Sequence, residues 1–558
     1  MKNQLFAITL AIGSALSATG IAAPDIPSDK FFKVETLSTG LVDAMEMAVL
    51  PTGDVFIVER TGALKWYSPK TNETKTIKEF DVSLRNGGNS RETGVLGIAI
   101  DPNFMINGWF YVYYSPKSPE IHRLSRFNFK NGKVTNERKM LEIEQSRDEG
   151  VCHEGGSLAF DSKGNLFLST GDNTAPFPAK GYPPLDERRG HEHENSQRTS
   201  ANTNDLRGKI LRIRPTSNGK YTIPSGNLFR KGLSKTKPEI FVMGCRNPWR
   251  ISVDQRTNNL FWGDVGPDAR KDSSRGPSGY CEINIAKEAG NYGWPYFIAD
   301  NKAYNEYDFD SNKTGETFVA TSPENKSRLN TGMDTLPPAK EPLWFHRRSC
   351  YCAGPAYYYG DYSDSENKLP KELDGCLITY DWNNGQMQLT KLTKDGGVEW
   401  KEDWLHSKKF IHPSDVEMGI DGTMYVLEYG KGWYNSKNGT LKKVTYQKAG
   451  QEVVNNDELD SRLEGLEVKH PGTILLSKSN CLSCHQTKEK SVGPTYVDVA
   501  ERYKDQKGAA DLLTQKIMNG GSGAWGQVPM PPNPQYNEEQ VSQMVDAILS
   551  IDAGGHKE

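Results

Sequence analysis

Two cysteines separated by two residues and followed directly by a histidine lie near the C-terminus, as Cys481, Cys484 and His485. At this spacing two thiols can add to the vinyl groups of one porphyrin while the adjacent imidazole binds its iron. Met530, in the proline-rich stretch VPMPP, offers a thioether as second axial ligand, which raises the reduction potential. We therefore expect one covalently bound haem c, with His485 and Met530 on the iron. A reducible cysteine pair beside a core methionine is the alternative.

A second candidate site consists of three clusters of glycines and polar residues, VCHEGGSL at 151–158, GCRNPWR at 244–250 and GDVGPD at 263–268. His153 is a candidate base, Arg246 a fixed cation and Asn247 an amide. A base beside a cation suits removal of a hydroxyl proton during hydride transfer, because the cation stabilises the developing anion. Turn carbonyls beside carboxylates suit Ca²⁺. Each feature alone also fits a hydrogen-bonded structural histidine or an ordinary turn.

Repeated short hairpins must position these clusters. Between residues 30 and 446, an alternating strand ends at an Asp-x-x-Gly or similar turn and a second strand follows, for example at 47–58, 158–168 and 416–427. Glycine and asparagine supply the positive-φ turn positions, while β-branched and aromatic residues fill the strands. Hairpins recurring at intervals of several tens of residues predict an all-β propeller, for which we expect six blades. A pair of β-sandwiches is the alternative.

The C-terminal part of the chain has a different pattern. Residues 447–466 are polar and poor in core residues, which predicts a linker. Residues 467–555 are expected to form a small all-α cytochrome c domain. Within them, 538–551 (EEQVSQMVDAILSI) places Val541, Met544, Val545, Ile548 and Leu549 on one helix face.

Composition and the N-terminus limit the partners and the location. The chain has 558 residues and a formal net charge of -3, with no long basic block, so nucleic acid is not expected as a partner. Residues 1–22 have the charged start, short apolar run and small residues of a signal peptide. No other segment approaches the roughly 18 apolar residues that span a bilayer. We expect a periplasmic or secreted bacterial protein without an integral membrane segment after cleavage.

An oxidising compartment permits disulfides among the six cysteines outside the haem motif. These are Cys152, Cys245, Cys281, Cys350, Cys352 and Cys376. Their pairing cannot be read from the sequence.

The polar clusters resemble those of the glucose/sorbosone dehydrogenase family of soluble, quinone-dependent aldose dehydrogenases. The resemblance covers roughly residues 35–445 and is most specific at H-x-G-G-x-L-x-F, R-N-P, G-P and E-I-N…G-N-Y-G-W-P. The C-terminal motifs C-x-x-C-H, V-G-P and W-G-x-x-P-M-P-P are similar to those of small bacterial monohaem cytochromes c. Together they resemble bacterial quinohaemoproteins in which a six-bladed propeller, binding pyrroloquinoline quinone and Ca²⁺, is fused to a cytochrome.

The resemblance implies a role for each matched residue. His153 matches the base that accepts the substrate's hydroxyl proton, Arg246 the arginine facing the quinone carbonyls, and Asn247 an amide contacting the cofactor. Gly266 and Pro267 match the residues whose backbone carbonyls hold Ca²⁺ against the quinone. Glu282 would help to order this ion-binding loop.

Two departures from the family pattern concern the late blades. The family uses a lysine and a pair of arginines there to hold the cofactor and line the sugar site. The corresponding stretches here read TYDWNNG at 379–385 and IHPSD at 411–415, without lysine or arginine. Either Arg347 or Arg348 replaces the missing cations, or the cofactor pocket is altered.

An insertion at 181–194 (GYPPLDERRGHEHE) separates GDN at 171–173 from NTNDLRGK at 202–209. It is a candidate lid, or a docking loop for an electron acceptor. His191 and His193 within it are candidate metal ligands, although a solvated loop also fits the sequence.

Three hypotheses of function follow. The first is an exported dehydrogenase that oxidises a sugar or another alcohol and passes electrons through haem to an external cytochrome, copper protein or quinone pool. The second is a non-catalytic haem protein whose propeller binds a partner or polysaccharide, which the missing late-blade cations favour. The third, a Ca²⁺-dependent lactonase, lacks a carboxylate cage in the sequence and leaves the haem unexplained. The first hypothesis explains both candidate sites, because a tethered haem is held near the reduced cofactor.

Overall fold

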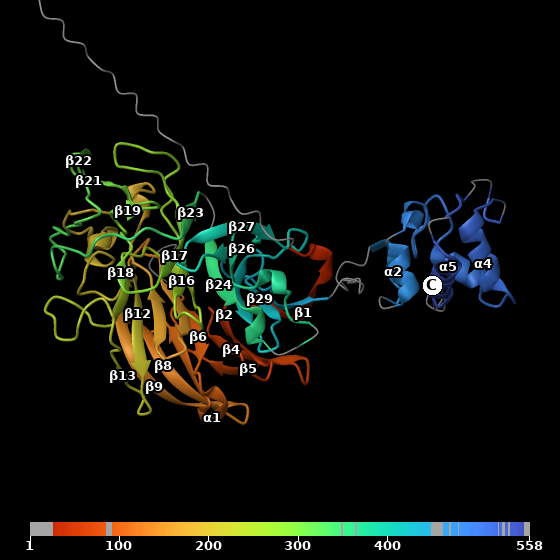
Figure 1. The fold of residues 1–558 in the computed structure, drawn as a ribbon, viewed down its shortest axis with the longest axis horizontal. Helices are drawn as coiled ribbons and strands as arrows, with labels where there is room; N and C mark the ends of the chain where they lie inside the picture. Colours follow the sequence, from red (N-terminus) through yellow and green to blue (C-terminus); the bar gives the residue numbers. More distant parts are fainter. Residues whose placement is uncertain are drawn as a thin grey trace, which may run out of the picture. The chain divides into compact units, whose positions relative to one another are not determined.

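The computed structural model describes residues 26–84, 92–347, 350–362, 365, 367–447, 461–467, 470–477, 479–522, 524–526, 530–533 and 536–551. The predicted signal peptide, most of the predicted linker and Arg348 lie outside these residues. The described chain forms two compact units, one of them β-rich and ending at Tyr446, the other helical and C-terminal (Figure 1).

The first unit is a six-bladed propeller, as the hairpin pattern predicts. The first blade consists of β2 (Ala44–Val49), β3 (Val55–Glu59), β4 (Ala63–Ser68) and β5 (Glu73–Glu79). The second consists of β6 (Val95–Ile100), β7 (Trp109–Tyr114), β8 (Ile121–Lys130) and β9 (Lys133–Glu144). The third consists of β10 (Gly155–Phe160), β11 (Leu166–Thr170), β12 (Lys209–Pro215) and β14 (Ile240–Met243), extended by β13 (Tyr221–Thr222) and β18 (Gly290–Asn291).

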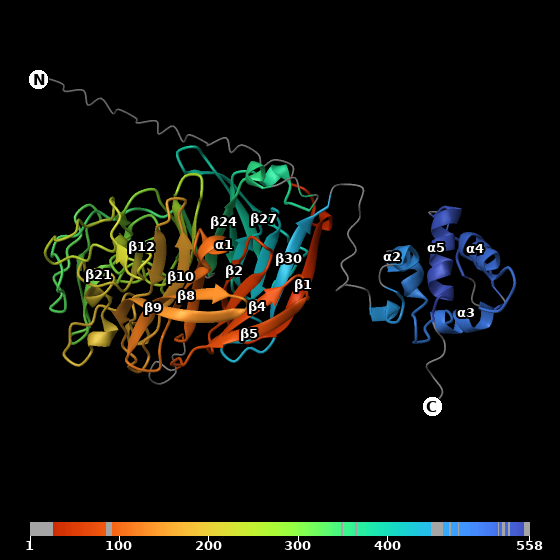
Figure 2. The same cartoon turned by 90° about the horizontal axis from the view of Figure 1, so that it is seen from below.

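The fourth blade consists of β15 (Pro248–Val253), β16 (Leu260–Asp264), β17 (Cys281–Ala286) and β23 (Trp344–His346). The fifth consists of β24 (Tyr351–Tyr357), β25 (Cys376–Asp381), β26 (Met387–Leu392) and β27 (Val398–Trp404). The sixth contains β28 (Pro413–Met418), β29 (Met424–Glu428) and β30 (Gly439–Tyr446). The sixth blade takes its fourth strand, β1 (Phe32–Leu41), from the other end of the unit. Figure 2 shows β1 beside β30.

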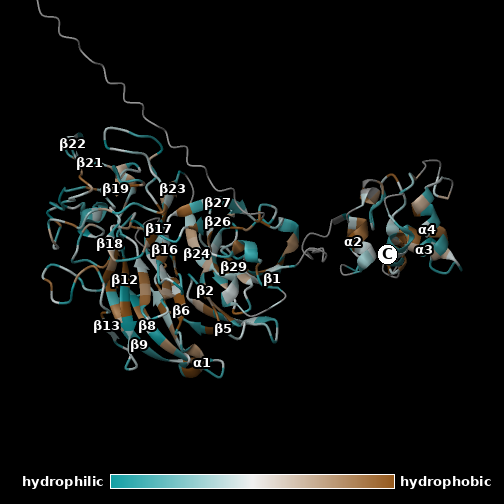
Figure 3. Ribbon diagram, viewed as in Figure 1, coloured by the Kyte–Doolittle hydropathy of each residue, from teal (hydrophilic) through white to brown (hydrophobic). Residues whose placement is uncertain are grey.

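The first strand of each blade lies at the centre of the propeller. β2 contacts β6 and β28, and the contacts continue through β10, β15 and β24 to close the ring. Some of these strands are apolar, as in β6 (VLGIAI), whereas others carry buried charged residues, such as Glu46 on β2, Arg250 on β15 and Asp415 on β28. The second strands are buried almost throughout, as in β3 (VFIVE). Burial of such strands between neighbouring blades is what drives closure of the ring. Figure 3 shows hydrophobic residues along the blades and mostly hydrophilic loops around β21 and β22.

All three polar clusters lie at one end of the blades, which we call the top face. The first strands begin there and the second strands end there, because each hairpin is antiparallel, with Gly155 opposite Thr170 and Pro248 opposite Asp264. The longest connections also lie at this end. One joins β11 to β12. Another, from β17 to β23, leaves from the opposite end of the blade and returns to the top face through β18. It contains the hairpins β19 (Phe297–Ile298) with β20 (Lys302–Ala303) and β21 (Asn305–Asp308) with β22 (Lys313–Thr317). A short helix, α1 (Phe104–Asn107), precedes β7.

The second unit is helical, as predicted. It contains α2 (Pro471–Ser477), a short 3-10 turn at Asn480–Ser483, α3 (Tyr496–Tyr503), α4 (Ala509–Asn519) and α5 (Glu538–Leu549). Capping boxes at Thr495 and Asn537 fix the starts of α3 and α5. Val541, Met544, Val545 and Ile548 are buried as predicted, but α5 ends at Leu549 because Ser550 is its C-cap, two residues earlier than the sequence pattern suggested. None of the described helices is long and apolar enough to cross a membrane.

Candidate functional site

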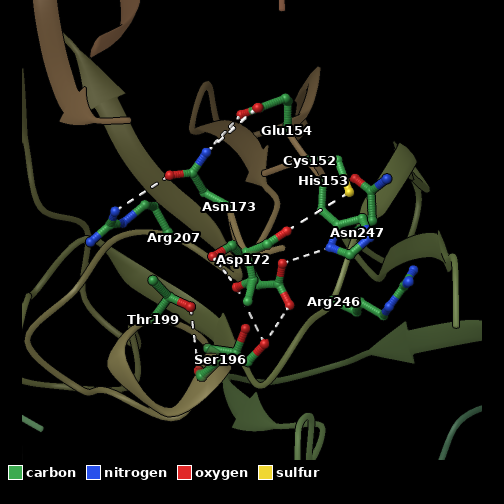
Figure 4. Close-up of polar contacts among 12 residues, drawn as sticks. Cys152, His153, Glu154, Asp172, Asn173, Ser196, Thr199, Arg207, Arg246 and Asn247 are labelled. Carbon is green, nitrogen blue, oxygen red and sulfur yellow. Dashed lines mark hydrogen bonds and ion pairs between the residues drawn. The ribbon is translucent and has the colours of Figure 1, made fainter. Parts of the chain in front are cut away.

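His153 and Asp172 form a hydrogen-bonded pair on the top face. His153 lies just before β10 with a positive φ of 69°, and Asp172 follows β11 on the other arm of the same hairpin. The Asp172 Oδ1 is 2.7 Å from the His153 Nδ1 (Figure 4). A carboxylate at this distance requires the proton on Nδ1, which leaves the Nε2 lone pair free to accept a proton. Among the described residues, Nε2 has no hydrogen-bond partner.

Asp172 is fully buried and saturated with donors. Its Oδ2 accepts hydrogen bonds from Ser196 Oγ at 2.8 Å and from Trp294 Nε1 at 2.9 Å. Burial acts to raise the pKa of this carboxyl, but the His153 ring and Arg246 outweigh burial and hold the pKa below its ordinary value. Asp172 is therefore a carboxylate at neutral pH, fixed in position by two segments from other parts of the top face.

Arg246 and Asn247 are placed by the same buried carboxylate. The backbone amides of both residues donate to Asp264, at 3.1 and 2.7 Å. The Arg246 guanidinium donates to Val265 O at 2.8 Å, and its Nε is buried without a hydrogen-bond partner among the described residues. The Asn247 side-chain oxygen accepts from Gly155 N at 3.0 Å. Because Asp172 N donates to Arg246 O at 2.8 Å, these residues adjoin the His153 pair.

The predicted ion-binding carbonyls lie in the loop after β16. Gly266 and Pro267 are both buried, and their carbonyl oxygens accept no hydrogen bond from the described part of the chain. A Cβ at Gly266 would overlap the Tyr280 carbonyl oxygen, so only glycine permits this close approach. The Gly266 amide donates to Cys281 Sγ at 3.4 Å. Free, fixed carbonyl oxygens are the donors that Ca²⁺ requires, so the loop fits this ion.

Glu282 lies on β17 opposite Asp264, and its oxygens already have partners. Oε1 accepts from Ala299 N at 2.6 Å and Oε2 from Asn284 Nδ2 at 3.3 Å. Burial, assisted by the charge of Asp264, raises the pKa of Glu282 to about 8. Its contacts connect it to the turn after β19 and to its own strand rather than to the Gly266 loop, and its role in ordering an ion site stays a prediction.

Aromatic rings occupy the late-blade stretches where the family has cations. Trp382 stacks on His412 with ring centres 5.1 Å apart and contacts Trp249 edge-on at 6.2 Å. Trp433, which is 65% exposed, extends this cluster. The described replacement candidate, Arg347, donates instead to Tyr280 OH at 2.9 Å, beside the ion loop. Arg246 and Asn247 still fit a ligand rich in carbonyls and carboxylates, since Arg246 keeps an unpartnered buried Nε.

The helical unit contains a cavity of about 210 Å³ next to the haem motif. Its lining includes Cys481, Cys484, His485 and Met530. The His485 Nδ1 is hydrogen-bonded to Pro494 O at 2.8 Å, so Nε2 is the ring nitrogen that would bind an iron, as in ligating histidines whose other nitrogen donates to a carbonyl.

The geometry around this cavity fits a haem. Gly493 lets the backbone pack directly against the His485 ring on the cavity wall, because a Cβ at this position would overlap that ring. Two backbone hydrogen bonds between Met530 and Gly521, at 2.8 and 3.0 Å, fix the methionine on the cavity wall. The four residues of the sequence motif are thus brought together around one apolar space.

The sequence reasoning missed three residues of the propeller site, Asp172, Ser196 and Trp294. Asp172 could have been sought just after β11, because the hairpin brings the residues that follow Thr170 close to those that precede Gly155. Ser196 and Trp294 come from the long top-face connections. Trp294 lies in the G-N-Y-G-W-P motif, but neither this motif nor the sequence around Ser196 indicates a contact with Asp172.

Comparison with known proteins agrees with both units. The glucose/sorbosone dehydrogenase family matches residues 41–434, and the cytochrome c family matches residues 471–552. The aldose sugar dehydrogenase of Escherichia coli is 26% identical over 420 residues, covering 74% of this chain and 92% of that protein. The crystal structure of the soluble aldose sugar dehydrogenase from Escherichia coli in the apo-form superposes with a TM-score of 0.52 at 23% identity, covering 75% of this chain and all of that one.

Two further relatives cover one unit each. Quinoprotein glucose dehydrogenase B of Acinetobacter calcoaceticus is 25% identical over 331 residues, which is 56% of this chain and 63% of that relative. Cytochrome c-552 of Nitrosomonas europaea is 44% identical over 77 residues, or 14% of this chain and 75% of the cytochrome. The chain belongs to the glucose/sorbosone dehydrogenase family and carries a C-terminal cytochrome c domain.

Proposed function

We propose that the protein is an exported dehydrogenase that oxidises a sugar or another alcohol with pyrroloquinoline quinone and Ca²⁺ and passes the electrons through haem c to an external acceptor. The observation that carries the proposal is the buried His153–Asp172 pair beside Arg246 at the centre of the top face. The names of two relatives, an aldose sugar dehydrogenase and a quinoprotein glucose dehydrogenase, support the substrate class and the cofactor.

His153 takes the role of general base. Its Nε2 accepts the proton of the substrate hydroxyl, while Nδ1 remains protonated and donates to Asp172. The imidazolium formed in this step is stabilised by the adjacent buried carboxylate, because their interaction is not screened by water. The proton is therefore held at a defined atom while the carbon-bound hydrogen leaves the substrate as hydride.

Arg246 and Asn247 bind and orient the cofactor, and the carbonyls of Gly266 and Pro267 hold the ion. Pyrroloquinoline quinone supplies the hydride acceptor when it is bound, with Ca²⁺ acting as a Lewis acid on its carbonyl. Burial of Arg246, which is 4% exposed, keeps its charge effective against the anion that develops during the reaction.

In the cytochrome c domain, Cys481 and Cys484 would attach the porphyrin, and His485 and Met530 would bind the iron. Haem c supplies a one-electron carrier when it is bound. The Pro494 carbonyl fixes the orientation of the His485 ring, and the bonds between Met530 and Gly521 place the thioether on the wall of the same cavity.

The test uses full-length, haem-loaded protein from an exporting host. Ca²⁺, pyrroloquinoline quinone and a panel of aldoses and alcohols are added, and the absorbance of reduced haem is followed. Reduction should require both quinone and substrate, and His153→Ala should abolish it without changing the haem spectrum. The exposed His406→Ala serves as the matched control. Unchanged turnover in His153→Ala would refute the role of His153.

A second candidate is a haem protein without dehydrogenase activity, whose propeller binds a partner. The stacked Trp382 and His412, in place of the family's late-blade cations, favour it. It predicts a normal haem spectrum that a redox partner can reduce but that no combination of quinone and substrate reduces.

A further inference from the structure

The insertion at 181–194 folds into a compact loop that gathers metal-ligating side chains outside the site described above. Its two arms are joined by a bridge between Leu185 and Asn195 and by a hydrogen bond from Asp186 N to Glu194 O. His191 is the N-cap of a 3-10 turn at Glu192–Glu194, so it lies one turn away from Glu194. One ligand atom each from Asp186, His191 and Glu194 lies within 4.8 Å of the others.

The distances between these atoms match a tetrahedral ion. The His191 Nδ1 is 3.1 Å from Glu194 Oε1 and 3.8 Å from Asp186 Oδ2. Ligands about 2.0–2.2 Å from a tetrahedral Zn²⁺ are separated by roughly 3.4 Å, which falls between these two values. The His193 Nε2, 3.7 Å from Glu194 Oε1, lies near enough to serve as a fourth ligand after a rotation of its side chain.

Burial and charge also point to a cation. Glu194 is only 9% exposed, and its Oε2 is buried without a hydrogen-bond partner among the described residues. An unpaired buried carboxylate oxygen is costly unless a cation or donor satisfies it. Arg188 donates to both oxygens of Asp186, so an ion there would share that carboxylate with the guanidinium, whereas Glu194 has no arginine or lysine partner among the described residues. The two histidine side chains, 37% and 27% exposed, leave the cluster accessible from solvent.

We propose that Asp186, His191 and Glu194, with His193 completing the shell, bind a Zn²⁺-type divalent cation. The imidazole nitrogens select a borderline transition metal over Ca²⁺, which prefers oxygen ligands throughout. This site is separate from the predicted Ca²⁺ loop at Gly266 and Pro267, and the binding itself does not depend on the proposed dehydrogenase activity.

The position of this site connects it to the candidate base. The chain continues from Glu194 through Asn195, whose side chain donates to Asp186 O at 2.9 Å, to Ser196, whose hydroxyl donates to Asp172. An ion that joins the two arms of the loop would therefore fix the segment that supplies Ser196 to the carboxylate that orients His153. On the proposed function, the ion supports the active site from outside without contacting the substrate.

The test measures Zn²⁺ binding directly on the untagged, full-length holoprotein. The protein is dialysed against a chelator, supplied again with excess Ca²⁺, and titrated with Zn²⁺ by calorimetry, with metal content checked by mass spectrometry. His191→Asn and Glu194→Gln are compared with the control His406→Asn, an exposed histidine elsewhere on the propeller. His153→Ala is included so that Zn²⁺ binding at the candidate base is recognised.

We expect one Zn²⁺ per chain in the wild type, His406→Asn and His153→Ala. Affinity should fall in His191→Asn and Glu194→Gln by more than the roughly 10- to 100-fold that loss of an outer-shell partner costs. Zn²⁺ should also raise the melting temperature of the wild type but not of these two variants, because it binds only the folded loop. Equal binding by all variants, or none by the wild type, would overturn the proposal. A wild type that binds Zn²⁺ but reduces no quinone would disprove the dehydrogenase and leave the metal site intact.

Discussion

Replacement of Asp172 by asparagine tests the proposed base most sharply. The Asp172 carboxylate accepts from three donors at once, and one of them, the Trp294 indole N–H at 2.9 Å, can only donate. An asparagine side chain has one oxygen and one NH₂ group. If its oxygen faces Trp294, its NH₂ group faces His153 Nδ1, which must then become an acceptor and move the proton to Nε2. The base would thus be protonated at the atom that has to accept the substrate proton.

The size of the loss follows from these contacts. A hydrogen bond to a charged group contributes about 1.5–3 kcal/mol, equivalent to roughly 10- to 150-fold in kcat/KM when it is absent. Locking a catalytic histidine in the wrong tautomer costs more, about 10⁴-fold in the serine protease triad. We therefore expect Asp172→Asn to lower kcat/KM for quinone-dependent haem reduction by about 10² to 10⁴-fold, with an unchanged haem spectrum.

A second substitution distinguishes tautomer inversion from simple damage. Removing the competing donor with Trp294→Phe lets the oxygen of the introduced asparagine turn toward His153, so the double variant should recover about tenfold or more over Asp172→Asn alone. Steady-state kinetics over a range of quinone concentrations separates catalysis from cofactor affinity. A loss of less than threefold in kcat/KM for Asp172→Asn would refute the reasoning. So would a double variant whose kcat/KM is lower than the value expected when the losses of the two single variants are added as free energies.

Three further predictions concern other groups. Because burial raises the pKa of Glu282 to about 8, the folded protein retains a proton that the unfolded chain releases near pH 4.5. The free energy of unfolding should therefore fall as pH rises from about 5 to 8. Glu282→Gln should flatten this slope in urea unfolding of Ca²⁺-free protein, and an unaltered slope would contradict the assignment. Met530→Leu should lower the haem reduction potential in a potentiometric titration, whereas Met518→Leu, packed in the same domain but away from the cavity, should not. Gly266→Ala should weaken Ca²⁺ affinity in calorimetry by at least tenfold, because a Cβ displaces the loop from Tyr280, while Gly360→Ala, where a Cβ would meet only the Arg256 side chain at 3.8 Å, should match the wild type.

The fold could be predicted in outline because its information is local. Each hairpin carries its own alternating strands and turn glycines, and the cytochrome motif lies within a few dozen residues. The end of α5 was misplaced by two residues because an apolar residue, Ile551, continues the helical period after the chain has left the helix at Ser550.

The candidate site could be predicted only in part, since half of it is assembled from distant segments. His153, Arg246 and Asn247 belong to recognisable clusters, and the structure places them together. Ser196 and Trp294 reach Asp172 through long connections whose paths depend on packing over the whole top face. The sequence shows that the expected late-blade cations are absent, but it does not show which side chains take their place. Only the structure shows Trp382 stacked on His412 and in edge contact with Trp249.

The pairing of β1 with β30 makes the order of synthesis matter. Residues 32–41 leave the ribosome first among the propeller strands, yet their partner at 439–446 follows about four hundred residues later. Closing so long a loop is entropically costly and slow, and until it happens β30 keeps an open strand edge. The sixth blade is therefore the part of the propeller whose strand edge stays exposed longest during folding, because no other blade waits for a strand from the far end of the unit.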